Sequence, residues 1–459
     1  MRNIFPIEKC NVDVLGIILQ HVVEEEARSF VPHRSYIKTP RAKAVFNLMQ
    51  VCRHWHQVVT STSCLWKILI LSLNKPKQSV WETIKQFALF AKSGEVDVYI
   101  YDIHSHPSPY LSEHPFETCA SHKPFLVDIL HLLPNIRKLF LEYSDEFAAF
   151  GDVWSETPTI RHLHYCGPPD SQGISFTSLT EKFPHLIHIS LDNPGSIDRI
   201  PESGVALFPD LRVLELKFTE SRTLAEPVMR LLSHCPNLEG FTYLGSTYGA
   251  HLNQAFSSLQ LEYLRDLEMD GSALPDIFIH LIETPDLRRL CFRDNSSRTL
   301  RDLVKKNPRI EDLAFHARDS SCYGEYLELL PHISCLSIRA TGRGAFLSEL
   351  YRRSSKGGRP ICASTLRKVR MIIPQEHPVG GSHFEKFVEA RCIPANREGL
   401  TSAGCLPLAE LVLEIPYPDK VLTEIYQCAS WKKAKVTKEG DSVFVLQWSP
   451  ENSQAVRSD

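Results

Sequence analysis

The stretch PDLRVLEL, Pro209 to Leu216, decides the fold of this chain because its pattern recurs along much of the sequence. The pattern is a proline, one residue, a lead apolar residue, two residues, an apolar residue, one residue and another apolar residue. The lead residues of nine successive copies, one of which (led by Leu264) lacks the proline, are Ile136, Ile160, Leu186, Leu211, Leu238, Leu264, Leu287, Ile310 and Ile333. Their spacings of 23 to 27 residues predict a repeat array, in which neighbouring copies bury one another's apolar sides.

Each copy predicts a short strand followed by a helix. Because side chains alternate along a strand, Leu214 and Leu216 are expected in the core, with Glu215 and Lys217 on the opposite, concave surface. Helical spacing follows the strands, and a proline ends each helix because it lacks the next hydrogen-bond donor. The segments with this spacing include 221–235, 273–283 and 299–307. Two later lead residues, Leu366 and Leu408, continue the array at longer gaps.

Length, charge and cysteine usage set the class of protein. The 459 residues exceed one ordinary globular core, and a net charge of −3 predicts no binding to nucleic acid or to an anionic membrane surface. The first residues lack the apolar run of a secretory signal, and no apolar window is long enough to span a membrane. The 13 cysteines include no C-x-x-C pair, so free thiols and a location in the cytoplasm and/or nucleus are expected.

The N-terminal region has a different pattern. Within 12–23, apolar residues at helical spacing predict one amphipathic helix, and they are Val14, Leu15, Ile18, Leu19 and Val22. Similar spacing resumes at Ala44 and continues through VCRHWHQVV, Val51 to Val59, so a single second helix is expected up to Ser61–Ser63. Leu65 and Trp66 then begin the next apolar run. These three segments predict a small helical module before the array.

The first helix, the V-C-R-x-W segment and the following Leu-Trp pair together resemble an F-box. The L-x-x-L-x-L period behind them resembles leucine-rich repeats. The resemblance implies docking to the Skp-type adaptor of a cullin–RING ubiquitin ligase, with the repeats holding a protein target. The residues it assigns to the adaptor are Val14, Leu15, Ile18, Leu19, Val51, Cys52, Trp55, Leu65 and Trp66.

A second interpretation stays open for the same residues. Trp55 and Trp66 would also serve as the core of a small cap on the array. The chain would then be a repeat scaffold that does not bind the adaptor. Under either interpretation the expected class is α/β: a three-helix F-box-like module, then a leucine-rich-repeat solenoid with a curved parallel sheet and helices on its convex side.

The predicted organisation has five parts. They are the F-box module (1–73), irregular first repeats or a linker (74–123), the solenoid (124–415), a C-terminal cap (416–448) and a flexible tail (449–459). A strand over 443–448 is expected in the cap, because the last repeat needs a cover over its core.

Polar residues gather on the predicted concave strands. Alternation places His162, His164 and Cys166 beside His188, Ser190 and Asp192, about 4.8 Å away on the next strand. It also places Asp266, Glu268 and Asp270 beside Arg289, Cys291 and Arg293. The histidine cluster has metal-ligating residue types, yet it is equally typical of a protein-recognition surface. The two charged rows either neutralise each other or form a bipolar patch.

A protein target is therefore the expected ligand of this surface, and its identity does not follow from the sequence. The residues predicted to contact it are His162, His164, His188, Asp192, Glu215, Asp266, Glu268, Arg289 and Arg293. The sequence contains no phosphate-cradling glycine loop, no G-x-S-x-G elbow and no H-E-x-x-H motif, so neither enzyme activity nor a metal or cofactor is expected.

Overall fold

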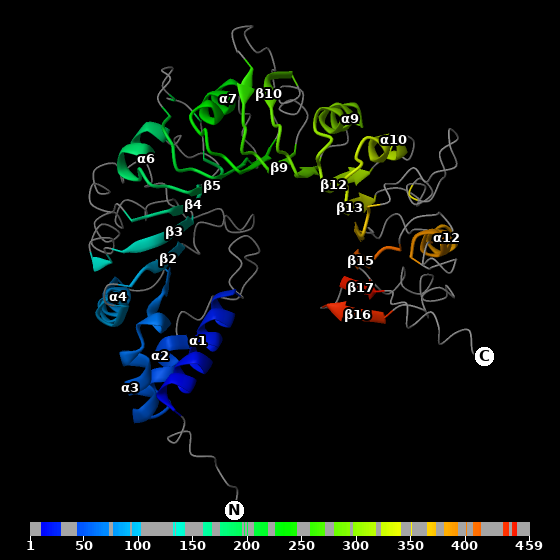
Figure 1. Ribbon diagram of the computed structural model, residues 1–459. Coiled ribbons are helices and arrows are strands. Elements are labelled where there is room, and N and C mark those ends of the chain that lie inside the picture. The colour runs from blue at the N-terminus through cyan, green and yellow to red at the C-terminus, as the bar shows by residue number, and fades with distance from the viewer. Residues whose placement is uncertain are drawn as a thin grey trace, which may run out of the picture. The chain divides into compact units, whose positions relative to one another are not determined.

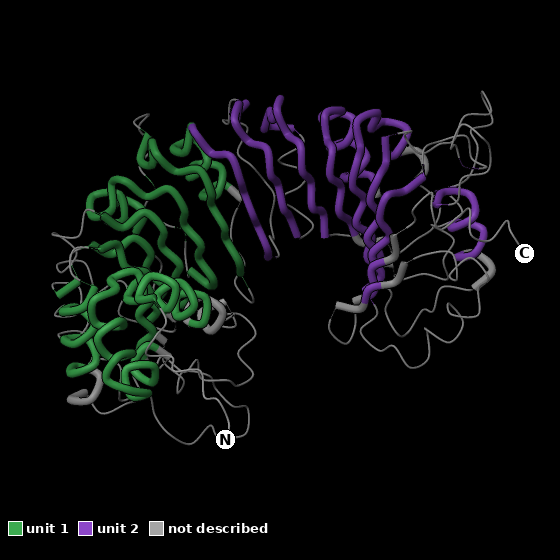
Figure 2. Tube along the Cα trace, turned by 60° about the horizontal axis from the view of Figure 1, so that its bottom comes forward, with its two compact units in different colours: residues 1–236 green, residues 237–459 purple. Residues whose placement is uncertain are grey.

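A computed structural model gives the fold. It describes residues 11–28, 44–72, 77–91, 94–101, 132–133, 135–142, 159–167, 175–194, 197, 200, 206–218, 225–245, 258–270, 280–293, 297–317, 323–340, 350, 365–372, 381–392, 401, 407–414, 435–439 and 443–447. The chain divides into two compact units, Met1–Pro236 and Asn237–Asp459 (Figure 2). The division falls inside the segment predicted as one solenoid, so each unit is described by itself.

Unit 1 begins with a group of helices. They are α1 (Val12–Arg28), α2 (Ala44–Met49), α3 (Arg53–Ser61) and the 3-10 helix η2 (Ser63–Trp66). We call these four elements the N-terminal helical module. The sequence predicted one continuous helix from Ala44, and this was wrong. Cys52 has an extended backbone and caps α3 by accepting a hydrogen bond from the Trp55 amide at 3.5 Å, so the chain turns between α2 and α3.

The sheet of unit 1 is parallel and follows the order of the chain. Its strands are β1 (Ile68–Ser72), β2 (Val96–Tyr101), β3 (Ile136–Glu142), β4 (His162–Cys166), β5 (His188–Asp192) and β6 (Val213–Lys217). The helices between them are α4 (Lys77–Ala91), α6 (Phe176–Lys182) and α7 (Ala225–Ser233). These three helices lie along one face of the strands (Figure 1).

Unit 2 continues the same alternation of strand and helix. Its main sheet contains β7 (Gly240–Leu244), β9 (Asp266–Met269), β11 (Arg289–Phe292), β12 (Asp312–Ala317), β13 (Cys335–Ala340), β14 (Lys368–Ile372) and β15 (Glu410–Glu414), all parallel. The helices are α9 (Ser297–Lys306), α10 (Tyr323–Glu328) and α12 (Gly381–Arg391). The protein is thus mixed α/β with long, mainly parallel sheet structure, which confirms the predicted class.

The lead residues of the sequence pattern form the inner layer of both units. All eleven, from Ile136 to Leu408, are at most 1% exposed. Along β6, Leu214 and Leu216 are fully buried whereas Val213, Glu215 and Lys217 are half-buried. The predicted alternation between core and opposite face is therefore confirmed. Full burial of a leucine side chain stabilises a fold by about 1.5–3 kcal/mol, so the period of the sequence sets this layer.

One predicted helix ends differently. The segment 273–283 was expected to be helical to its end, but Ile282–Glu283 forms the short strand β10, which pairs in parallel with β8 (Leu259–Gln260). The Leu261 amide donates to the Glu283 carbonyl oxygen at 2.9 Å and extends this pairing. The backbone hydrogen-bonding groups of these residues are thus paired between successive copies of the pattern.

The described C-terminal strands reverse direction. β17 (Val443–Gln447) pairs antiparallel with β15 on one side and with β16 (Lys435–Glu439) on the other. Phe444 and Val445 are buried, so β17 covers apolar surface beside the last parallel strand, as expected for the strand predicted there. The predicted tail, 449–459, lies outside the described residues. Of the helices that the structure describes, none has the length and hydropathy needed to cross a membrane.

Candidate functional site

The outward face of α1 carries apolar side chains. Val14 and Ile18 are each 48% exposed, Ile17 is 58% exposed and Val22 is 44% exposed. Residues at these spacings lie on one side of a helix. Val51, in the turn between α2 and α3, is 56% exposed. We call Val14, Ile17, Ile18 and Val22 the α1 face. A group of large exposed apolar residues on one helix is typical of a surface that meets a partner.

The opposite side of α1 packs inward, and this side is rotated relative to the predicted stripe. Leu15, Gly16 and Leu19 are buried, and Gln20 is half-buried. A Cβ atom added to Gly16 would lie in ordinary van der Waals contact with the Thr62 side chain, at 3.9 Å, so this side of α1 faces the residue that follows α3. The predicted stripe therefore divides between the core and the surface.

Trp66 lies at the centre of the helical module. Its side chain is fully buried, and its ring centroid lies 5.4 Å from that of Phe46, 5.5 Å from Phe87 and 4.7 Å from Phe90. Its indole nitrogen donates to the Val59 carbonyl oxygen at 2.8 Å. α4 supplies two of these three rings, so Trp66 joins the module to the first helix that follows it.

The residues predicted to meet an adaptor therefore lie in different places. Val14, Ile18 and Val51 are exposed, and Cys52 and Trp55 are half-buried. Leu15, Leu19, Leu65 and Trp66 belong to the core, which corrects their assignment to a surface; they are between 0% and 2% exposed. Their physical role is to hold the exposed residues in place.

A polar network covers the face of unit 1 opposite α4, α6 and α7, which we call the polar face of unit 1. His162 is register partner to His188, His164 to Ser190 and Cys166 to Asp192, as the sequence predicted. Ser190 Oγ on β5 donates a hydrogen bond at 2.9 Å to the carboxylate of Glu215 on the next strand, β6. His188 Nε2 lies 3.6 Å from the same carboxylate. The network therefore crosses from β4 to β6.

Lys217 closes this network with two ion pairs. Its ammonium nitrogen lies 3.0 Å from the Glu215 carboxylate and 3.6 Å from that of Asp192. The neighbouring His188 imidazole, followed by the charge of Lys217, holds the pKa of Glu215 well below its usual range despite the opposing effect of burial. Glu215 is thus an ionised group held by three neighbours.

Aromatic rings extend the polar face toward the start of the sheet. The rings of Phe140 and His164 are stacked, with centroids 4.2 Å apart and an interplanar angle of 7°. On the other side of Phe140, the ring centroid of Tyr99 lies 5.8 Å from that of Phe140. His162 meets His188 edge to face at 5.8 Å. Burial lowers the pKa of His162, and the nearby charges of Lys138, His188 and Arg137 lower it further.

A charged pair and a cavity lie where the helical module meets the sheet. The register of β2 and β3 shifts between Val96 and Asp97, so that Asp97 pairs with Lys138 and Arg137 is the extra residue. Such a shift re-aims a side chain. The Arg137 guanidinium donates to both Asp97 carboxylate oxygens, at 2.9 and 2.8 Å, and this bonding raises the pKa of Arg137.

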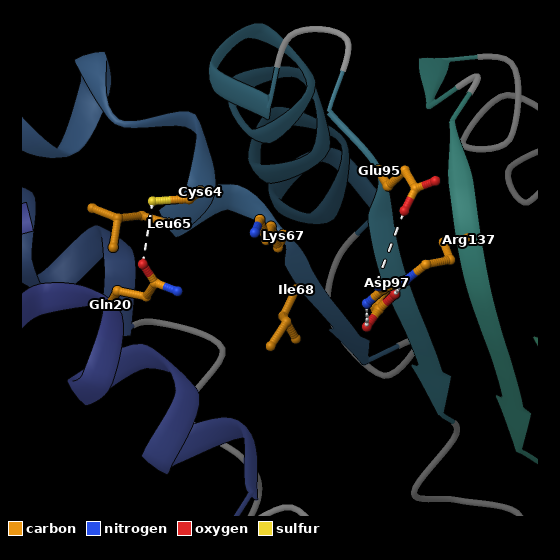
Figure 3. Close-up of a pocket in the computed structure, with 8 residues that line it drawn as sticks. All are labelled: Gln20, Cys64, Leu65, Lys67, Ile68, Glu95, Asp97 and Arg137. Atoms are coloured by element: carbon orange, nitrogen blue, oxygen red, sulfur yellow. Dashed lines mark hydrogen bonds and ion pairs between the residues drawn. The ribbon is translucent and has the colours of Figure 1, made fainter. Parts of the chain in front are cut away.

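The cavity has a volume of about 390 Å³. Figure 3 shows the Asp97–Arg137 pair at one end and the contact between the Cys64 thiol and the Gln20 side-chain oxygen, 3.6 Å, at the other. Its lining consists of Gln20, Cys64, Leu65, Lys67, Ile68, Glu95, Asp97 and Arg137. It therefore joins α1 and η2 to the first three strands.

In unit 2 the corresponding face carries charges of alternating sign. Glu268 pairs with Arg293, whereas Arg289 pairs with Asp312 at 3.7 Å. Asp266 and Arg289 are register partners, so the sequence placed their strands correctly. The prediction of neutralisation between the two rows holds for Glu268 and Arg293, but Arg289 instead pairs with the strand on its other side. Exposed pairs of this kind contribute little to stability.

Further ion pairs continue along this face. Lys368 lies 2.7 Å from Glu410, and Arg370 lies 2.8 Å from Glu414. Burial raises the pKa of the Asp312 carboxyl, and burial beside Asp312 raises the pKa of the Cys335 thiol to about 11. Cys335 is therefore a neutral thiol near pH 7 and a poor nucleophile or metal ligand.

The structure places the predicted target-binding residues in two separate groups, one in each unit. His162, His164, His188, Asp192 and Glu215 form the network of unit 1, and Asp266, Glu268, Arg289 and Arg293 lie in unit 2. Within the described ranges, no group of three or more His, Cys, Asp or Glu residues is arranged to hold a metal ion.

Several site residues were missed by the sequence prediction. Ile17 could have been found by widening the arc of α1 that was treated as apolar. Asp312 occupies the same position in its copy of the pattern as Asp266, so alignment of the copies would have indicated it. The Asp97–Arg137 pair left no such signal, because it depends on a register shift.

Comparison with known proteins gives no further assignment. The chain matches no protein-family model. It also has no significant match among curated proteins.

Proposed function

We propose that this protein is the substrate-recognition subunit of a cullin–RING ubiquitin ligase. In this proposal the N-terminal helical module is an F-box that docks the Skp-type adaptor. The strands that follow form a leucine-rich-repeat solenoid that binds a protein target. The protein itself performs no bond-making step, because catalysis comes from holding a target near a charged conjugating enzyme.

The observation that carries the proposal is the exposure of the α1 face above a well-packed module. Val14, Ile17, Ile18 and Val22 are 44–58% exposed, although Leu15 and Leu19 beside them are 2% and 1% exposed. A helix that only capped the sheet would keep its apolar residues on the packed side. The exposed side chains are therefore available to a second protein.

The positions of the V-C-R-x-W segment and of the Leu-Trp pair also support a module with a buried core and an exposed docking surface. Cys52 caps α3 and thereby fixes the turn that exposes Val51. Trp66 anchors η2 and α4 from within. The V-C-R-x-W segment thus sets the turn that exposes Val51, and the Leu-Trp pair behind it supplies buried residues of the module.

The test is a pull-down of the full-length protein with a purified Skp-type adaptor. The variant to compare is Ile18→Asp combined with Val51→Asp, because both side chains are exposed and their replacement leaves the core intact. Leu89→Asp is the matched control, since Leu89 is 69% exposed on α4, outside the α1 face. Retention of the adaptor by wild type and control, and its loss by the double variant, would support the ligase role.

Failure of the folded wild type to retain the adaptor would contradict the proposal. The alternative would then hold: a repeat scaffold whose F-box-like module serves only as a cap. The burial of Leu65 and Trp66 is the observation that favours this alternative.

A further inference from the structure

On the polar face of unit 1, the acidic groups are engaged while cationic groups remain available. Both oxygens of Asp97 accept hydrogen bonds from Arg137, and Glu215 is held by Ser190, His188 and Lys217. In contrast, the Lys138 ammonium group makes no ion pair with any residue that the structure describes. A carboxylate that is already paired repels an incoming anion less than a free one does.

Lys138 and two histidines lie in a line across the sheet. Lys138 on β3 is register partner to His162 on β4, and His162 is register partner to His188 on β5. Neighbouring strands are about 4.8 Å apart, so the three side chains follow one another at intervals that a single extended segment can match. Each of them is half-buried, and the surrounding strands therefore limit the side-chain entropy lost on binding.

The line begins at the cavity beside the helical module. Asp97, the register partner of Lys138 on β2, belongs to the cavity lining together with Lys67. Lys67 is exposed and makes no ion pair within the described part of the chain. Glu95 is the one lining carboxylate that is loosely held, because its oxygen lies 3.9 Å from the Arg137 guanidinium. The cavity thus offers a cation and room for a side chain at the end of the line.

We infer that the row Lys138–His162–His188 and the adjoining cavity bind an acidic segment of a partner protein, whose oxyanions are carboxylates or phosphates. Lys138 forms the permanent charge contact, His162 and the His188 ring nitrogen that does not face Glu215 donate hydrogen bonds, and Lys67 meets the end of the segment in the cavity. Charge-assisted hydrogen bonds of this kind are stronger than neutral ones. The inference rests on the proposed function only in identifying this partner with the ligase target.

The site has a direction of pH dependence. The groups around His162 are Lys138, His188, Arg137 and Asp97; burial lowers the pKa of His162 most, and the positive charges of Lys138 and Arg137 oppose its protonation further. A bound anion offsets this repulsion, so binding and protonation of His162 favour each other. Affinity is expected to rise as the pH falls from 7.5 toward 5.5. Glu215 stays ionised over this range, because its pKa lies well below it.

The experiment measures fluorescence anisotropy of a labelled hexaglutamate peptide with the full-length protein, and hexalysine serves as the charge-reversed probe. Lys138→Gln is expected to weaken hexaglutamate binding about tenfold, which corresponds to about 1.4 kcal/mol. Lys67→Gln is expected to weaken it by a smaller factor. Lys305→Gln is the matched control, because Lys305 is an exposed lysine on α9 in unit 2. This variant is expected to leave the affinity unchanged.

A second readout separates a binding role from a structural one. The imidazole NMR signal of His162, assigned with His162→Gln, reports its pKa directly. Lys138→Gln removes a repelling charge and is expected to raise that pKa, and hexaglutamate is expected to raise it in wild type. Competition by inorganic phosphate against acetate then shows whether phosphates or carboxylates fit the row better.

Equal binding of hexalysine and hexaglutamate, or an unchanged affinity in Lys138→Gln, would overturn the inference. A silent Lys67→Gln variant would overturn the part assigned to the cavity. The adaptor pull-down uses different residues and a different partner, so failure of either proposal is seen separately.

Discussion

The indole nitrogen of Trp66 donates a hydrogen bond to the backbone carbonyl oxygen of Val59 at 2.8 Å, within a shell of three phenylalanine rings. Val59 lies near the end of α3, one of the three rings belongs to α2, and the other two belong to α4. A single side chain thus joins α2 and α3 to α4, the first helix after the module. The shape of the proposed docking surface depends on this buried group.

Replacement of Trp66 is therefore expected to destabilise the module strongly. Trp66→Ala should cost about 3–5 kcal/mol, because it leaves a cavity and a carbonyl oxygen without its donor. Hydrogen exchange followed by mass spectrometry should show faster exchange over 44–72 than in wild type. Leu89→Ala, an exposed substitution on α4, is the control. Unchanged exchange in Trp66→Ala would contradict the role given to this residue.

The inner layer of lead and strand leucines gives a second prediction. Leu214→Ala should lower the free energy of unfolding by about 2–5 kcal/mol, since Leu214 is fully buried. Val213→Ala on the same strand should cost about 1 kcal/mol or less, because Val213 is half-buried. Urea denaturation of the two variants checks the difference. Equal losses of unfolding free energy in the two variants would contradict the difference in burial between the two faces of β6.

The network around Glu215 predicts a dependence of stability on pH. The pKa of Glu215 is lower in the folded protein than in the unfolded chain, so the ionised form stabilises the fold above the unfolded value of about 4.3. This contribution is lost as the pH falls through the folded value. Melting temperatures between pH 6 and pH 3 should fall less steeply for Glu215→Gln than for wild type.

The exposed carboxylate Glu181 on α6 supplies the control for that series. Glu181→Gln should follow the wild-type curve across the whole range. If Glu215→Gln and wild type lose stability in parallel as the pH falls, the hydrogen bonding to Glu215 does not stabilise its ionised form.

The Asp97–Arg137 pair gives a fourth prediction. A double-mutant cycle with Asp97→Asn and Arg137→Gln should reveal a coupling energy of about 1.5–3 kcal/mol, the range for hydrogen bonds to charged groups. Asp97 is 6% exposed, so loss of its partner leaves a poorly solvated carboxylate. Chemical denaturation of the four proteins provides the measurement. A coupling energy near zero would show that the register shift does not create a specific pair.

Much of the sheet was predictable from the sequence. The period of 23 to 27 residues places an apolar residue at the same position in every copy. Burial of a leucine is favourable enough to direct that residue into the core in each copy. Strand alternation then placed His162 beside His188 and Asp266 beside Arg289, as the register shows. Local pattern and long-range packing agree at these residues.

The candidate sites were less predictable, because they depend on tertiary contacts. The core side of α1 includes Gly16 and Gln20, which a search for apolar residues does not find. They lie on this side because Thr62 is the neighbour of Gly16 and the Cys64 thiol contacts the Gln20 side chain. The break before α3 depends on the backbone of Cys52, and the placement of Arg137 depends on a register shift. No periodicity in the sequence encodes these features.

The most direct test of the proposed function is the dissociation constant for a purified Skp-type adaptor, measured by calorimetry on wild type, Ile18→Asp and Leu89→Asp. We expect binding by wild type and Leu89→Asp, and a loss of at least about tenfold for Ile18→Asp, because a charge would be buried against the partner. Equal affinity of Ile18→Asp and Leu89→Asp, or no binding by folded wild type, would contradict the assignment of the α1 face as the docking surface.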